Sequence, residues 1–281
     1  MSNAAKFVAP PDASTSRTTV PNENAVWPRT IHFFPANIPT IALHSLRSSS
    51  EHAGADARER HVGIDLKNWP DEGSGWSRFS GGPSFVPVMA QVAFSPDGDV
   101  LMVTEKATNK IDTWSVNDDG YAVNARTINS SGATPFGFTF VRRFAIISEA
   151  GPSALSSYEV EDDGQLELLT GTLTDTQKAN CWVIATRNEL YAYTTNTASG
   201  TISSYLISRQ AFLSLLNAVA GKTAAGGAPI DLALSNDSHF LFVRDGAKGM
   251  VDAFQVEGDG SLTPLGSASG VPAGAQGLAA R

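Results

Sequence analysis

The sequence lacks several features that would direct its chemistry or its location. Cys181 is the single cysteine, so no disulfide can form within the chain and nothing points to an oxidising compartment. No apolar run reaches the roughly 18 residues that a membrane-spanning helix needs. The N-terminal stretch holds one lysine and no apolar core of a signal peptide. From these absences we expect a soluble, cytoplasmic protein with no membrane partner.

Basic charge is also scarce. The chain has 20 Lys and Arg residues against 28 Asp and Glu, a net charge of −8. A nucleic-acid partner is therefore not expected, because binding phosphates requires clustered Lys and Arg. Hydrophobic residues make up 42% of the chain and charged residues 17%, a composition typical of a globular protein. A length of 281 residues allows one large domain or two small ones.

The two parts of the chain differ in composition. Residues 1–85 hold eight of the 15 prolines, and their eight basic residues balance eight acidic ones, so the net charge comes from residues 86–281. The best strand candidate in the first part, residues 31–43, is interrupted by Pro35 and Pro39, which predicts an edge strand or a loop. We expect residues 1–85 to be a divergent N-terminal region.

Residues 86–281 contain a repeated pattern. Equivalent positions lie 46, 45, 49 and 45 residues apart, at Met89, Pro135, Asn180, Pro229 and Gly274. Each unit has two apolar strands, a polar loop, an alternating third strand and a fourth strand, which predicts the four-stranded antiparallel blade of an all-β propeller. The blades are expected at about residues 89–134, 135–179, 180–228 and 229–273. Residues 274–281 resemble an opening strand and are expected to close the ring, with a frayed tail as the alternative.

Asp-Gly pairs mark the turn between the third and fourth strands. They occur as Asp119-Gly120, Asp163-Gly164 and Asp259-Gly260. An Asp-Gly pair provides the positive φ angles that a tight hairpin needs. The third unit lacks the pair, and its residues 211–219 could form a short helix instead.

The repeats resemble a known family. The stretches that carry the likeness, over about residues 87–281, include VAFSPDG, VTEKATN, GATPFGF, YAYTTNT and AGAQGLAAR. They resemble the lactonase-family seven-bladed β-propellers, which include propeller-type 6-phosphogluconolactonases and carboxymuconate cyclases. The resemblance implies hydrolysis of a small anionic sugar-acid or dicarboxylate lactone, with no cofactor.

The first 85 residues do not share this resemblance, and seven blades at this period need roughly 340 residues. Three explanations remain for the shortfall. Part of residues 5–86 could come from a shifted or truncated reading frame, the region could be a genuine elaboration with incomplete or partly disordered blades, or a second chain could complete the ring. The sequence does not decide the oligomeric state.

Strand direction assigns polar residues to two rims. In a meander, the loops that precede the first strands and those that join the second to the third strands share one rim, beside the central channel. A lactone hydrolase needs a group that activates water and a donor that holds the oxyanion. Glu149 and Glu105 are the candidate bases, with Arg244, Lys106 or Asn196 as their electrophilic partner. The expected substrate-binding residues are Lys106, Asn196, Gln91, Trp182, Asp231, Asp245 and Gln276.

Other interpretations of these residues stay open. The two glutamates could pair with Lys106 or Lys110, or cap loop backbone. The resemblance implies a rim histidine where this chain has Leu232, which leaves open a non-catalytic scaffold that binds a ligand or protein, or an inactive incomplete propeller. Cys181 is expected to be a buried structural thiol. The hairpin turns make the opposite rim acidic, and no metal site is expected there because the carboxylates lack a ligand-like spacing.

Overall fold

The computed structural model describes residues 88–118, 120–272 and 275–280, and the backbone of three strands before them, β1 (Thr30–His32), β2 (Thr40–Ser45) and β3 (Arg60–Asp65). The other residues expected to be disordered or to form incomplete blades lie outside the described residues, as does Asp119.

Four sheets follow one another along the chain, each with four consecutive antiparallel strands. The first blade consists of β4 (Met89–Phe94), β5 (Val100–Glu105), β6 (Lys110–Val116) and β7 (Ala122–Asn129). The second consists of β8 (Pro135–Val141), β9 (Phe144–Glu149), β10 (Ala154–Val160) and β11 (Leu166–Thr174). The third consists of β12 (Asn180–Ala185), β13 (Tyr191–Asn196), β14 (Thr201–Ile207) and β15 (Leu213–Lys222). The fourth consists of β16 (Pro229–Leu234), β17 (Phe240–Asp245), β18 (Met250–Val256) and β19 (Leu262–Ser269).

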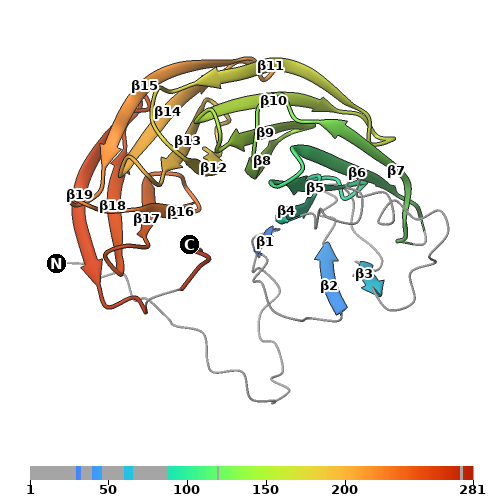
Figure 1. Cartoon of the computed structure of the whole chain (residues 1–281), viewed down its shortest axis with the longest axis horizontal. Coiled ribbons are helices and arrows are strands. Elements are labelled where there is room, and N and C mark those ends of the chain that lie inside the picture. The colour runs from blue at the N-terminus through green and yellow to red at the C-terminus, as the bar shows by residue number, and fades with distance from the viewer. Residues whose placement is uncertain are drawn as a thin grey trace, which may run out of the picture.

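This architecture confirms the predicted all-β fold of four-stranded blades. The first strand of each blade begins at the residue that the repeat period marks. The four blades follow an arc, with β4, β8, β12 and β16 on its inner side and β7, β11, β15 and β19 on its outer side (Figure 1). The inner strands therefore provide the wall that faces the centre of the arc. The described residues include no helix able to span a membrane.

Apolar side chains fill the space between neighbouring blades. Met102, Ile147 and Tyr158 lie in the cluster that joins the first two blades. Ile146, Leu155 and Tyr205 join the second and third blades, and Tyr193, Leu241 and Phe254 join the third and fourth. Both faces of the second strands β5 and β9 are buried along their whole length, which explains their nearly continuous apolar sequence. Burial of each such side chain contributes about 1.5–3 kcal/mol to stability.

The hairpin turns use a positive φ angle at one position. In the second and fourth blades Gly164 (φ 82°) and Gly260 (φ 81°) adopt it, while the preceding aspartates do not. In the third blade Ala211 (φ 57°) takes the same place, and Ser208 and Phe212 form the closing backbone hydrogen bond at 2.9 Å. The expected short helix over residues 211–219 is therefore wrong. The hairpin forms without glycine because Ala211 and Leu213 are buried in the core between blades.

Two segments outside the blades complete the described fold. Strand β1 pairs antiparallel with β4 at the edge of the first sheet, as predicted for residues 31 and 32, and β2 pairs with β3. Residues 275–280 form no strand, in contrast to the expected closing strand over residues 274–281. Their glycine and alanine content gives this segment little strand propensity. They lie against the inner strands instead of pairing with a sheet edge.

Candidate functional site

The predicted rim is held together by the same backbone contact in each blade. The residue that follows the second strand donates its N–H to the loop before the first strand, at 2.8–2.9 Å in all four blades. The pairs are Lys106 with Val88, Ala150 with Thr134, Thr197 with Ala179 and Gly246 with Ala228. These contacts place the two sets of loops side by side, as strand direction predicts.

A β-bulge lies near the start of every inner strand. The register shifts fall between Met89 and Gln91, between Pro135 and Phe138, between Asn180 and Val183, and between Pro229 and Asp231. A bulge redirects the side chains next to it, and bulges are common beside active sites. The four bulges therefore decide which residues face the centre of the arc. The alternating pattern of the sequence contains no signal for them.

Hydroxyl groups of the second strands hold these bulges in place. Thr104 accepts a hydrogen bond from the Gln91 N–H at 3.2 Å and donates to the Phe136 carbonyl in the next blade at 2.6 Å. Ser148 lies within hydrogen-bond distance of the Gly137 carbonyl, at 3.0 Å, and of the Cys181 carbonyl in the next blade. The first two bulges are thus linked to their own blade and to the following one.

The inner strands enclose a cavity of about 400 Å³, within the range typical of small-molecule sites. Its lining includes Gln91, Phe138, Trp182, Asp231 and Leu278. A smaller cavity of about 160 Å³ lies at the rim, lined among others by Lys106, Phe136, Cys181, Trp182, Asp231 and Gln276. Because Trp182 and Asp231 line both cavities, the two are adjacent and form one candidate site.

Asp231 is the titratable group at the centre of this site. Its side chain is only 3% exposed, and Oδ1 accepts the Leu232 N–H at 2.8 Å. Oδ2 has no hydrogen-bond partner among the described residues. Burial raises the pKa of Asp231 to about 7, against the opposing effect of the backbone amides of Leu232, Leu278 and Gly277. Near neutral pH this carboxyl group can therefore both accept and return a proton.

A cation and two aromatic rings form the wall beside Asp231. The Lys106 ammonium lies 4.9 Å from the centroid of the Phe136 ring, and the Phe136 and Trp182 rings meet edge to face at 5.4 Å. Gly137 makes room for this arrangement, because a Cβ atom there would overlap the Trp182 indole. The wall thus offers an apolar surface with one positive charge at the rim.

The two glutamines of the site have different surroundings. Gln91 is buried, and its amide pairs with the backbone of Phe138, donating to the carbonyl at 2.8 Å and accepting the N–H at 2.8 Å. Its polar atoms therefore join the first two inner strands. Gln276 is exposed at the smaller cavity.

Glu149 and Asp245 occupy equivalent positions at the ends of second strands, and both are fully buried. Glu149 Oε1 accepts the Gly132 N–H at 2.7 Å, and Asp245 Oδ1 accepts the Ala228 N–H at 2.9 Å. Each carboxylate thus caps the loop before its own blade, which was the alternative for Glu149. Asn196, at the same position in the third blade, donates to the hydroxyl groups of Thr201 and Ser203.

Glu105 and Arg244 also lie behind the rim. Glu105 accepts a hydrogen bond from Thr108 and lies beside Asp112 in the first blade. Burial, then the neighbouring Asp112 carboxyl group, raises the pKa of Glu105 to about 7. Arg244 donates to the carbonyl groups of Asp245, Met250 and Pro272 and is 2% exposed.

Five of the ten expected site residues thus come together in the cavities. These are Gln91, Lys106, Trp182, Asp231 and Gln276. The other five, Glu105, Glu149, Asn196, Arg244 and Asp245, line neither of these two cavities. The catalytic roles expected for Glu149, Glu105 and Arg244 stay predictions, but their surroundings favour structural roles.

Sequence reasoning did not include Cys181 in the site. Cys181 lines the smaller cavity, and burial raises the pKa of its thiol to about 12. The thiolate is therefore rare at neutral pH, in agreement with a structural thiol.

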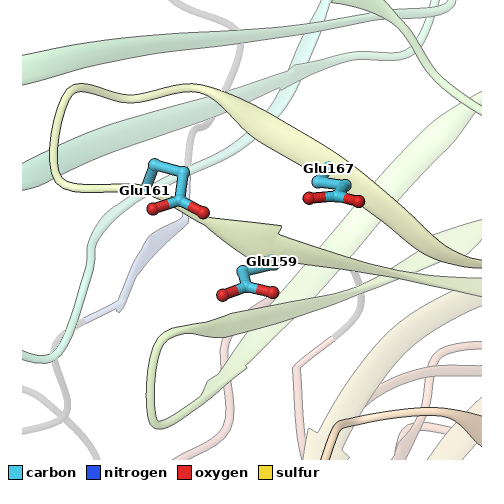
Figure 2. Close-up of side chains that lie close together, drawn as sticks. All are labelled: Glu159, Glu161 and Glu167. Carbon is cyan, nitrogen blue, oxygen red and sulfur yellow. The ribbon is translucent and has the colours of Figure 1, made fainter.

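Acidic side chains also gather on the hairpin between β10 and β11. Carboxylate oxygens of Glu159, Glu161 and Glu167 lie within 4.8 Å of one another (Figure 2). Arg143 forms an ion pair with Glu159 at 2.7 Å, and the other two glutamates are exposed. Solvent and this arginine account for the cluster, so we assign no ligand to it.

Comparisons with known proteins agree with the fold. Residues 146–274 match the family model described as Lactonase, 7-bladed beta-propeller. No curated protein matches the chain.

Solved structures similar to this chain are also propellers of this kind. A putative 6-phosphogluconolactonase from Bacteroides fragilis NCTC 9343 is 17% identical, with a TM-score of 0.55 over 64% of this chain and 54% of that one. The periplasmic gluconolactonase PpgL of Pseudomonas aeruginosa is 16% identical, with a TM-score of 0.56 over 66% and 56%. A Lactobacillus plantarum protein is 16% identical, with a TM-score of 0.58 over 66% and 56%. The chain spans little more than half the length of these proteins, and at this identity the likeness shows the fold alone.

Proposed function

We propose that this protein is a lactone hydrolase whose substrate binds at the rim, with Asp231 as the base that activates water. One observation supports this above the others. A buried carboxyl group with a pKa of about 7 and an unpartnered oxygen lies in the same cavity as a cation and an aromatic wall. Groups with shifted pKa values in a cavity are typical of catalytic sites.

The chemistry requires few groups. Asp231 Oδ2 takes a proton from a water molecule, and the water oxygen attacks the lactone carbonyl carbon. The negative charge that develops on the carbonyl oxygen is stabilised by the Lys106 ammonium. The ring C–O bond then breaks, the proton on Asp231 passes to the leaving alkoxide, and the product is an open-chain hydroxy acid. No oxidant or reductant is needed.

The wall of the site favours a particular kind of substrate. Trp182 and Phe136 offer apolar surface to a small ring, and Gln276 offers an amide at the rim. Lys106 would attract a lactone that carries a carboxylate or a phosphate, in line with a sugar-acid or dicarboxylate lactone. The similarity to a putative 6-phosphogluconolactonase and to a periplasmic gluconolactonase supports the same substrate class for this proposal.

Asp231 fits the role of base better than Glu149 does. Glu149 is fully buried and caps the Gly132 N–H, whereas Asp231 lines both cavities. A base must lie within hydrogen-bond distance of the water that it activates, so access to the cavity decides between the two carboxylates.

A second candidate function is ligand binding without turnover. It is favoured by Leu232, which stands where the resemblance implies a histidine, and by the lining of the two cavities, to which no described histidine contributes. Such a scaffold would bind lactones or their hydroxy acids at the same aromatic wall. An inactive, incomplete propeller would neither hydrolyse nor bind a lactone.

The test is hydrolysis of 6-phosphogluconolactone and of neutral gluconolactone by the purified full chain, followed by acid release at constant pH. We expect turnover above the buffer rate and a loss of about 100-fold or more in Asp231→Asn. Asp162→Asn, on an exposed turn, is the matched control and should keep full activity. Turnover no faster than buffer would refute the proposal, as would an unchanged rate in Asp231→Asn. A loss in Glu149→Gln alone would assign the base to Glu149.

A further inference from the structure

Two buried aspartates of the fourth blade face the third blade, outside the candidate site. Asp245 lies opposite Met250 and Asp252 lies opposite Val243, so the two aspartates are diagonal neighbours on one face of the sheet. Val243 on this face belongs to the same apolar cluster as Tyr193 of the third blade, the neighbour of the fourth on the arc (Figure 1). The two carboxyl groups therefore lie between these blades, and neither lines the two cavities.

Each carboxyl group has one oxygen with hydrogen bonds and one without. Asp245 Oδ1 accepts the backbone N–H groups of Ala228 and Lys248, at 2.9 and 3.1 Å, and Asp252 Oδ1 accepts the Ser267 hydroxyl. Oδ2 of each aspartate is buried and has no partner among the described residues, and no ion pair between described residues involves either side chain. Two buried carboxylates without a cation are costly, so this arrangement requires a further partner.

Oxygen atoms from the segment between β15 and β16 lie beside Asp245 Oδ2. A Cβ atom placed on Gly227 would be 2.1 Å from Asp245 Oδ2 and 2.3 Å from Thr223 Oγ1. The Ala224 carbonyl oxygen would be 2.9 Å from the same atom. Three oxygens thus lie around one point, next to a residue that has no side chain. Thr223 donates its hydroxyl proton to the Gly200 carbonyl at 3.1 Å, so this proton does not go to Asp245.

The spacing of these oxygens suits a calcium ion. Asp245 Oδ2 and Thr223 Oγ1 are close enough for one cation to contact both at roughly 2.3–2.6 Å, the length of a Ca²⁺–oxygen bond. Carboxylate, hydroxyl and carbonyl oxygens are ligands that a hard cation prefers. Mg²⁺ fits less well, because it demands near-ideal octahedral geometry at about 2.0–2.1 Å.

We propose that a calcium ion binds between the third and fourth blades, held by Asp245, Asp252, the Thr223 hydroxyl and the Ala224 carbonyl. Its two positive charges balance the two carboxylates, and water completes the coordination. The ion joins the loop before β16 to β17 and β18, and so stabilises the contact between the two blades. Because its ligands come from separate segments of two blades, no ligand spacing marks the site in the sequence. The site is independent of lactone hydrolysis.

The position of Asp252 differs among the blades and provides a conservative variant. The second and third blades have Ser156 and Ser203 there, and the first blade has Asp112. Asp252→Ser therefore introduces a residue that two neighbouring blades accept at this place. Asp112→Ser is the matched control, because it makes the same change at the equivalent position of the first blade, away from Thr223 and its neighbours.

The test is calorimetric titration of the full chain with CaCl₂ after removal of metals with EDTA, in about 0.15 M NaCl. We expect a dissociation constant on the order of 1 mM or tighter, weaker binding of Mg²⁺, and a higher unfolding temperature in about 10 mM calcium. Asp252→Ser should weaken calcium binding about tenfold or more and remove the thermal shift, whereas Asp112→Ser should keep both. Absence of calcium binding, an unchanged affinity in Asp252→Ser, or equal losses in the two variants would overturn the proposal. Equal affinity for Mg²⁺ would overturn the assignment to calcium.

A second pair of variants decides the matter if Asp252→Ser does not fold. Thr223→Val removes one ligand oxygen and keeps the shape of the side chain. Its control is Thr172→Val, because the Thr172 hydroxyl lies beside Gly132 in the second blade, near the single carboxylate of Glu149. Only Thr223→Val should weaken calcium binding, and equal affinities in this pair would overturn the proposal.

Discussion

Gly137 in the second blade packs directly against the Trp182 indole in the third, so closely that a Cβ atom on Gly137 would overlap the ring. Both residues lie next to the bulges of neighbouring inner strands. The absence of a side chain at Gly137 therefore allows Trp182 to reach Phe136 and both cavities. The shape of the candidate site thus depends on a residue that contributes no side chain to it.

Gly137→Ala should therefore displace Trp182 and destabilise the fold. Overpacking at such a contact costs about 1–3 kcal/mol of unfolding free energy. Urea unfolding measures this cost, and quenching of tryptophan fluorescence by acrylamide reports whether the indole becomes more exposed. Gly258→Ala is the control, since a Cβ atom there would meet nothing within 4 Å, and it should change stability by less than about 0.5 kcal/mol. Equal stability of the two variants would contradict the prediction.

Gln91→Leu should weaken the contact between the first two blades. The substitution leaves the buried N–H and C=O groups of Phe138 without the side-chain partner they now share. An unsatisfied buried polar group costs about 1–3 kcal/mol, so we expect a loss of roughly 2 kcal/mol or more in urea unfolding. Gln276→Leu, at an exposed glutamine, serves as the control and should have little effect on stability. A Gln91→Leu protein as stable as the control would show that the amide does not join the blades.

Stability should decrease as the pH rises toward and beyond neutrality. Burial raises the pKa values of Asp231 and Glu105 to about 7 in the folded protein, from ordinary values near 4. The folded state therefore binds these protons more tightly than the unfolded state does. Their contribution to stability is fully present below about pH 4 and is lost as the pH rises through about 7.

Glu105→Gln separates the two groups, because a glutamine amide does not titrate and leaves Asp231 as the remaining carboxyl group with a pKa near 7. We expect the variant to lose about 1–3 kcal/mol less than the parent protein between pH 5 and 8, as measured by urea unfolding at each pH. A parent protein whose stability rises with pH over this range would contradict the expected direction. A variant with an unchanged pH dependence would assign the effect to Asp231 alone.

Cys181 should react slowly with alkylating reagents in the folded protein. With a pKa of about 12, its thiolate fraction at pH 8 is roughly 1000-fold below that of an ordinary thiol. Iodoacetamide labelling, followed by mass spectrometry, should therefore be slow in buffer and roughly 1000-fold faster in 8 M urea. Comparable rates in the two conditions would show that the thiol is accessible and ionised.

The period of the sequence was sufficient to predict the blades, because each unit repeats the same order of short apolar strands and turns, and apolar strands such as β5 and β9 are buried between neighbouring blades. Met89, Pro135, Asn180 and Pro229 begin the inner strands at the expected residues. Strand direction was also sufficient to predict the rim, since up-and-down connectivity fixes which loops meet. These features depend on local sequence and on the order of the strands alone.

Whether a rim side chain is buried behind the rim or reaches the cavity could not be predicted in the same way. Glu149 and Asp231 both lie at strand ends of one rim, yet Glu149 turns inward to cap the Gly132 amide and Asp231 reaches the cavity. The difference arises from the bulges and from loop amides that need acceptors, neither of which has a sequence period. The position of residues 277 and 278 in the same cavity lining as Asp231 likewise depends on tertiary structure.

Lys106 should determine the preference for anionic substrates. Its ammonium lies over Phe136 at the smaller cavity, where it would attract a phosphate or carboxylate on the lactone. In Lys106→Met we expect kcat/KM to fall about 10–100-fold for 6-phosphogluconolactone and by a smaller factor for neutral gluconolactone, because a charge-assisted hydrogen bond contributes about 1.5–3 kcal/mol. Raising the ionic strength should reduce the preference of the parent protein for the anionic lactone and leave that of the variant unchanged.

Lys110→Met is the control, since Lys110 bonds Asn129 outside both cavities. Equal losses for the charged and the neutral substrate would mean that Lys106 stabilises the oxyanion and does not select the substrate charge.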